Sequence, residues 1–158
     1  MINLSINKKV LIFGFIFTFF SSFGQSFFLG LFNPSIRGEL NITHGQFGAI
    51  YAGATICSSF VLIWFGKKID ELKLIYFSFL VILLLFFSSL FFSLVNNIYL
   101  LFLGIYFLRL SGQGLMSHTA TTSISRYFEK RRGKALSYIW LGMSLGEFLL
   151  PILIVYLL

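Results

Sequence analysis

The sequence predicts an all-α protein, a polytopic transmembrane bundle of five helices, and three observations support this prediction. Hydrophobic residues make up 58% of the 158 residues and charged residues only 11%, whereas about a quarter of the residues in soluble globular proteins are charged. The apolar residues form runs long enough to cross a hydrocarbon core of about 30 Å. The basic residues cluster between these runs, as topology signals do in membrane proteins.

The predicted spans follow one another through short polar connections. The first is too long for a removable signal peptide and has no A-x-A-like cleavage site. We expect Asn33-Pro34 to end it, because proline disfavours helical geometry in the residue before it. Asn96-Asn97 predicts a tight turn between the third and fourth spans. In chain order, we place the spans at about residues 10–32, 47–65, 74–95, 98–122 and 135–158.

The distribution of basic residues predicts the orientation of these spans. With the amino terminus inside, the inner segments carry all but two of the 12 lysines and arginines. Arg37 lies in an outer connection, and Arg109 lies inside the fourth span. This asymmetry follows the positive-inside rule. We therefore expect a multi-pass protein of the plasma (inner) membrane, surrounded by the lipid bilayer, with its amino terminus in the cytoplasm.

Several classes of function are disfavoured. The net charge of +7 does not indicate nucleic-acid binding, because the basic residues form no basic face with groove-reading or stacking groups. The single cysteine, Cys57, supplies no disulfide framework or metal cluster. No nucleotide-binding loop or nucleophile–base constellation is present. We therefore predict neither an enzyme nor a bound cofactor.

The fourth and fifth spans each carry a costly polar group. Arg109 and Gln113 lie four residues apart and so share one helical face. At about 1.5 Å per residue, Arg109 and Glu147 fall near the middle of the membrane on consecutive spans. We expect them to form an ion pair, since either charge alone would pay a large desolvation cost. The sequence is compatible with two interpretations of this pair. An anionic substrate or a proton disrupts it, or it is a permanent structural pair.

Two further polar residues in the spans have two interpretations each. The near-neutral pKa typical of histidine suits His118 to a proton relay, although a hydrogen-bonded residue near the membrane boundary is the simpler interpretation. Gln25 offers hydrogen bonds either to a solute or to another helix.

Small residues predict where helices approach closely. Gly112 and Gly114 flank Gln113, while Gly142 and Gly146 form a G-x-x-x-G pattern with Pro151 beyond it. Such residues favour close packing and tolerated bends in membrane helices. After the second span, Gly66 and Asp70 form G-x-x-x-D. A solvated loop acid is the simpler interpretation of this short pattern.

Taken in order, these patterns resemble the amino-terminal half of a major facilitator superfamily transporter. The resemblance rests on G-x-x-x-D after the second span, R-x-x-G-x-G in the fourth, RYFEKRRGKAL after it and G-x-x-x-G-x-x-x-x-P in the fifth. FGQSFFLGLFNPSIRGEL, THGQFGAIYAGATI and the RYFEKRRGKAL loop are most similar to the monocarboxylate and oxalate-formate porter branch. The resemblance covers residues 1–158 as one amino-terminal portion.

The resemblance implies secondary active transport of a small solute by alternating access. It implies that Arg109 lies near the substrate or proton path. It also implies that the loop from Gly66 to Asp70, with Arg126, Arg131 and Arg132, helps to hold an outward-facing state. The branch handles carboxylates, so we expect an organic anion such as a monocarboxylate, coupled to a proton or substrate gradient.

The family has twelve spans, and we therefore expect this chain to be a fragment whose partner is the missing carboxyl-terminal half. The alternative is a small membrane scaffold or partner subunit without transport activity of its own. Arg109, Gln113 and Glu147 weigh against this alternative, because a scaffold needs no charged groups inside the membrane.

Overall fold

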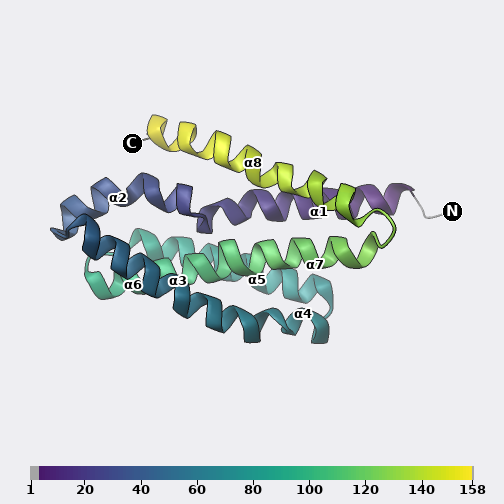
Figure 1. The fold of residues 1–158 in the computed structure, drawn as a ribbon, viewed down its shortest axis with the longest axis horizontal. Helices are drawn as coiled ribbons and strands as arrows, with labels where there is room; N and C mark the ends of the chain where they lie inside the picture. Colours follow the sequence, from purple (N-terminus) through teal and green to yellow (C-terminus); the bar gives the residue numbers. More distant parts are fainter. Residues whose placement is uncertain (1–3, 158) are drawn as a thin grey trace.

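The computed structural model describes residues 4–157, which form helices and two irregular helical segments joined by short turns (Figure 1). No strand occurs in this range. The elements are α1 (Leu4–Ser21), η1 (Ser22–Gly24), α2 (Ser26–Leu40), α3 (His44–Gly66), α4 (Lys68–Glu71), α5 (Leu74–Ser93), α6 (Ile98–Leu108), η2 (Arg109–Met116), α7 (Ser117–Tyr127) and α8 (Arg132–Leu157).

Five helical stretches are long and apolar enough to cross a membrane, and they confirm the predicted fold class. α1 and α2 form the first, α3 and α4 the second, and α5 the third. α6, η2 and α7 form the fourth, and α8 the fifth. The stretches cover Lys8–Leu40, His44–Glu71, Leu74–Ser93, Ile98–Tyr127 and Arg132–Tyr156.

The prediction that Asn33-Pro34 ends the first span is wrong, because α2 continues through Pro34 to Leu40. Proline removes one hydrogen bond and crowds the residue four positions earlier. That residue is Gly30, which is exposed and has no heavy atom near its missing Cβ. Helix α2 ends instead at Leu40, and the left-handed conformation of the next residue, Asn41 (φ 51°), is typical of a helix carboxyl cap.

Helix α3 begins with a capping box that the sequence carries as T-H-G-Q. The backbone N–H of Gln46 donates to the Thr43 hydroxyl at 3.2 Å, and the backbone N–H of Thr43 donates to the Gln46 side-chain oxygen at 2.8 Å. Both donors would otherwise be unpaired at a helix amino terminus. The cap fixes where the chain turns back between the first two spans.

The basic connections lie at one end of the bundle. Figure 1 shows the start of α1, α4 and the turn between α7 and α8 at the same end, and the end of α8 at the opposite end. This arrangement agrees with five successive crossings. The assignment of the basic end to the cytoplasm and of the protein to the plasma membrane stays a prediction.

The fourth span lies at the centre of the bundle. Half of its most apolar window is buried, against 17% for the second span. Its side chains Leu101, Ile105, Leu115 and Ile124 are fully buried. By contrast, large apolar side chains of α5 and α8 are exposed, as expected for surfaces that face lipid tails. The irregular segment η2 therefore lies where most spans can reach it.

Candidate functional site

The first span breaks near the middle of its length, between α1 and α2. Gln25 adopts an extended conformation (ψ 158°), and the tight turn η1 precedes it. Small hydroxyl residues lead into the break. The Ser21 hydroxyl donates to the Thr18 carbonyl at 2.7 Å, and Thr18 donates to the carbonyls of Phe15 and Ile139. Such bonds compete with regular helix hydrogen bonds, and the break leaves backbone carbonyls that need other donors.

The fourth span is also irregular at this level, and the two irregular segments touch through glycines. A Cβ on Gly24 would lie 2.3 Å from the Leu108 carbonyl oxygen and 2.4 Å from the Gln113 nitrogen. A Cβ on Gly112 would lie 2.6 Å from the Gly24 nitrogen. Segment η2 is a π-helix, a form that frequently marks functional sites. Only glycine permits the backbones of η1 and η2 to approach this closely.

Arg109 begins η2 and connects it to the break. Its Nη1 donates to the carbonyl of Gly24 at 3.1 Å and lies 3.5 Å from the Ser26 hydroxyl. Its Cζ lies 5.2 Å from the centre of the Tyr51 ring on α3, a cation–π distance. The Tyr51 and Ser26 hydroxyls lie 2.7 Å apart. The guanidinium therefore joins α2, α3 and η2.

The charge of Arg109 is buried and lacks a carboxylate partner. Arg109 is 8% exposed, and its Nε has no hydrogen-bond partner. The ion pairs among the described residues are Lys68–Glu71 and Arg126–Asp70, and neither involves Arg109. A buried cation without a counter-charge is costly. The guanidinium therefore lacks the counter-charge that would offset the cost of its burial.

A polar groove of about 300 Å³ runs between α3 and η2 beside this guanidinium. The Thr55 hydroxyl in this groove is buried and has no hydrogen-bond partner. The groove holds hydroxyls, an amide and a guanidinium but no acid, so its chemistry suits an anion. Its lining residues are Thr55, Ser58, Ser59, Leu62, Arg109, Leu110, Gln113 and Gly114. We call this site the Arg109 groove.

The predicted ion pair between Arg109 and Glu147 does not form. Helix α8 packs against the first span through Gly142 and Gly146, where an added Cβ would lie 2.3 Å from the Phe15 oxygen and 2.2 Å from the Ser22 hydroxyl. Glu147 follows Gly146 directly and is exposed on the outside of the bundle. Arg109 instead bonds to the backbone of the broken first span.

A second set of predicted residues meets at the basic end of the bundle. The Nε2 atom of His118 lies 3.2 Å from the Gly66 carbonyl oxygen, and a Cβ on Gly66 would lie 3.3 Å from this ring atom. Arg126 forms an ion pair with Asp70 and also donates to the Ile69 carbonyl at 3.5 Å. These contacts join the end of α3 and the short helix α4 to α7.

The remaining predicted residues lie outside the Arg109 groove. The half-buried Gln25 lies at the break, where its backbone bonds to Ser22 and Leu29. Arg131 and Arg132 are exposed, and Pro151 lies inside α8 without ending it.

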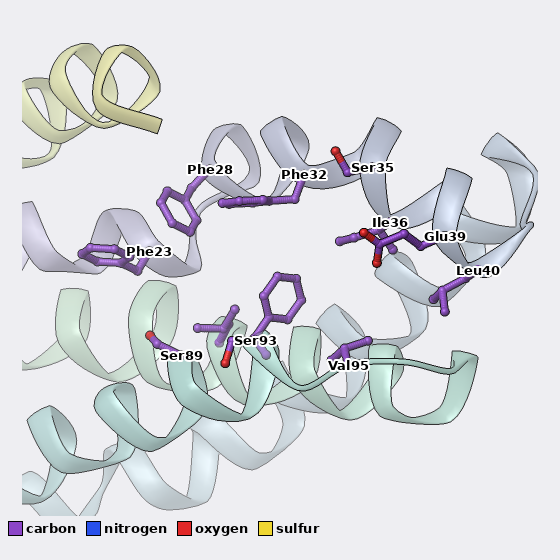
Figure 2. Close-up of a pocket in the computed structure, with 12 residues that line it drawn as sticks. Phe23, Phe28, Phe32, Ser35, Ile36, Glu39, Leu40, Ser89, Ser93 and Val95 are labelled. Carbon is purple, nitrogen blue, oxygen red and sulfur yellow. The ribbon is translucent and has the colours of Figure 1, made fainter. Parts of the chain in front are cut away.

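A separate hollow lies between α2 and α5 (Figure 2) and contains none of the predicted site residues. Its volume is about 400 Å³, and four phenylalanines are among its lining residues.

Sequence reasoning missed the contribution of α3 to the Arg109 groove. Tyr51, Thr55 and Ser58 or Ser59 recur at the i, i+4 spacing of one helix face. That spacing is the signal that could have revealed a polar stripe. The stripe is easy to overlook, because hydroxyl side chains in membrane helices commonly donate to carbonyls of their own helix. Ser58 and Ser59 do so here.

Comparison with known proteins identifies one family. The family model described as Major Facilitator Superfamily matches residues 14–158. No curated protein and no solved structure matches the chain.

Proposed function

Because the chain belongs to the major facilitator superfamily, a family of membrane transporters rather than enzymes, we propose that it carries the anion-binding wall of a secondary transporter. The proposed solute is a small organic anion such as a monocarboxylate. The observation that carries this proposal is the buried guanidinium of Arg109, which has no carboxylate partner among residues 4–157.

The chemistry of the Arg109 groove supports a carboxylate rather than a cation or a sugar. Guanidinium–carboxylate hydrogen bonds are short and charge-assisted, and they are about twice as strong as neutral ones. Arg109 and Thr55 both line the groove, and each has one buried donor without a partner; we propose that these donors turn toward the two oxygens of one carboxylate when it binds. Gln113 adds an amide that can bond to a hydroxyl or keto group on the solute.

The shape of the Arg109 groove supports a role as one wall of a larger cavity. It is open on one side and lined only by α3 and η2. In the proposed mechanism, further membrane helices supply the opposite wall, and the two walls rock about the solute in alternating access. The contacts of Gly66 and Asp70 with α7 then hold one of the two states.

The proposal includes a proton or substrate gradient as the driving force. His118 and Glu147 are titratable side chains within the spans, and we propose them as candidates for the proton path. We also propose that the protein belongs to the monocarboxylate and oxalate-formate porter branch. The sequence patterns given above support this assignment.

The proposal is tested by ligand binding to the chain in lipid nanodiscs. Lactate should raise the midpoint of thermal unfolding, and lactamide, which has the same shape without the charge, should not. Arg109→Gln should abolish the rise, and Thr55→Val, which keeps the shape of the side chain, should weaken lactate binding about tenfold.

The matched control is Arg37→Gln, because Arg37 bonds to Asn33 outside the Arg109 groove. This variant should bind lactate normally. Equal stabilisation by lactate and lactamide, or lactate binding that survives in Arg109→Gln, would refute an anion site at this residue.

A further inference from the structure

The hollow between α2 and α5, which we call the phenylalanine pocket, has a chemistry opposite to that of the Arg109 groove. Figure 2 shows Phe28 and Phe32 on one wall, Ser89 and Ser93 on the other, and Glu39 toward one end. Its lining residues are Phe23, Phe28, Phe32, Ser35, Ile36, Glu39, Leu40, Ser89, Phe92, Ser93, Val95 and Leu108. None of these residues is cationic, and Glu39 is the single acid among them.

The four phenylalanines form a continuous series of edge-to-face contacts. The ring centroids of Phe23 and Phe28 lie 4.9 Å apart, those of Phe28 and Phe32 lie 5.4 Å apart, and those of Phe32 and Phe92 lie 6.4 Å apart. The rings are inclined by 62–73° to one another. Because the face of an aromatic ring is electron-rich, such a lining attracts cations as well as apolar groups.

The polar groups of the phenylalanine pocket are mostly acceptors. Ser89 donates its hydroxyl hydrogen to the Leu85 carbonyl at 3.0 Å, and Ser93 donates to the Leu90 carbonyl at 2.7 Å. The lone pairs of both hydroxyls are left for a ligand. Glu39 takes part in neither of the ion pairs found among the described residues. The pocket therefore offers a carboxylate, lone pairs and ring faces, all of which favour a cation with N–H donors.

We propose that the phenylalanine pocket binds a hydrophobic organic ammonium ion. The ammonium group bonds to Glu39 toward one end of the pocket, and the apolar body lies among the phenylalanine rings. The volume of about 400 Å³ falls within the range of small-molecule sites, about 300–1,000 Å³, so the occupant is a small amine rather than a whole lipid. This proposal does not depend on the anion site, because the two sites share no lining residue.

The experiment measures binding of radiolabelled phenethylamine to the chain in phosphatidylcholine nanodiscs, with empty nanodiscs subtracted. Unlabelled phenethylamine should compete fully, and phenethyl alcohol, which has the same ring and chain without the charge, should compete at least about tenfold more weakly. Equal competition by the alcohol would overturn the proposal, because the pocket would then recognise only apolar bulk.

Two variants separate the contribution of the charge from that of the rings. Glu39→Gln should weaken phenethylamine binding about tenfold, whereas Glu129→Gln, a matched change of an exposed loop acid, should have no effect.

Phe32→Leu should weaken binding about threefold by removing one ring face. Phe86→Leu, at an exposed ring outside the pocket, is its control. Unchanged binding in Glu39→Gln would also overturn the proposal.

A third arm distinguishes the small amine from a lipid headgroup of the same chemistry. Phenethylamine binding is repeated in nanodiscs that contain phosphatidylethanolamine, whose headgroup is a primary ammonium. Unchanged affinity supports a small amine as the occupant. Competitive loss of binding would overturn that assignment in favour of the lipid.

Discussion

Arg109 donates a hydrogen bond to the backbone carbonyl of Gly24, 3.1 Å away, and so ties the centre of the fourth span to the break in the first. This contact explains how a buried arginine is tolerated without a carboxylate. The break supplies a carbonyl that needs a donor, and Tyr51 offers its ring face to the same guanidinium. The Nε of Arg109 still lacks a partner, and on our proposal this free donor serves the solute.

The glycine crossing between η1 and η2 should be intolerant of any side chain. Gly24→Ala places a Cβ within 2.4 Å of backbone atoms on both Leu108 and Gln113, and backbone cannot move aside as a side chain can. We expect a loss of about 3 kcal/mol or more in unfolding free energy, measured by denaturant titration in micelles.

Gly48→Ala is the matched control for this prediction, because no heavy atom lies near the missing Cβ of Gly48 in α3. That variant should be neutral or slightly more stable, since alanine favours helix over glycine. Equal stability of the two variants would contradict the close approach of η1 and η2.

The ion pair between Arg126 and Asp70 should affect motion of the loop more than global stability. Its side chains are 51% and 64% exposed, and exposed pairs typically contribute less than about 1 kcal/mol. Asp70→Asn should therefore leave the unfolding midpoint nearly unchanged but increase hydrogen exchange in residues 67–73. The charge-swapped double variant, Asp70→Arg with Arg126→Asp, should restore much of the protection. Unaltered exchange in Asp70→Asn would show that the pair does not hold this loop.

His118 should stabilise the end of the second span through the Gly66 carbonyl. His118→Leu leaves that buried carbonyl without its side-chain partner and should cost about 1 kcal/mol in unfolding free energy. His118→Gln, which can still donate a hydrogen bond, should recover part of the loss. Equal stability of both variants with the native protein would mean that the 3.2 Å contact contributes nothing.

The orientation in the membrane is testable with single cysteines in a Cys57→Ser background. A membrane-impermeant maleimide added to intact spheroplasts should label Asn96→Cys, in the turn after α5, and spare Lys130→Cys, in the basic turn before α8. The reverse pattern would place the amino terminus outside and would contradict the orientation predicted from the basic residues.

The sequence was sufficient to predict the helical fold, because membrane spans are defined by the length and apolarity of a run. The break between α1 and α2 could not be predicted in this way. It depends on Gly24 meeting Gly112 and Arg109 of a distant segment. Helix α2 likewise continues through Pro34, which the local rule on proline does not reveal.

Part of the candidate site was predictable from chemistry and part was not. The cost of a charge inside a membrane singled out Arg109. The pairing with Glu147 failed because depth along a span fixes height but not rotation about the helix axis. Gly146 faces α1, and Glu147 is turned about 100° from it, onto the outside of the bundle. The rotation of α8 is set by packing, which a single sequence does not display.

The central claim, that Arg109 binds the carboxylate of a solute, is tested most directly by solid-state NMR distance measurement. Carboxyl-labelled lactate is added to the chain in lipid, with its arginine guanidinium groups isotopically labelled. A charge-assisted contact predicts a carbon–nitrogen separation of about 4 Å, present in the native protein and in Arg37→Gln and absent in Arg109→Gln. A lactate signal with no arginine within reach, or one that persists in Arg109→Gln, would contradict the claim.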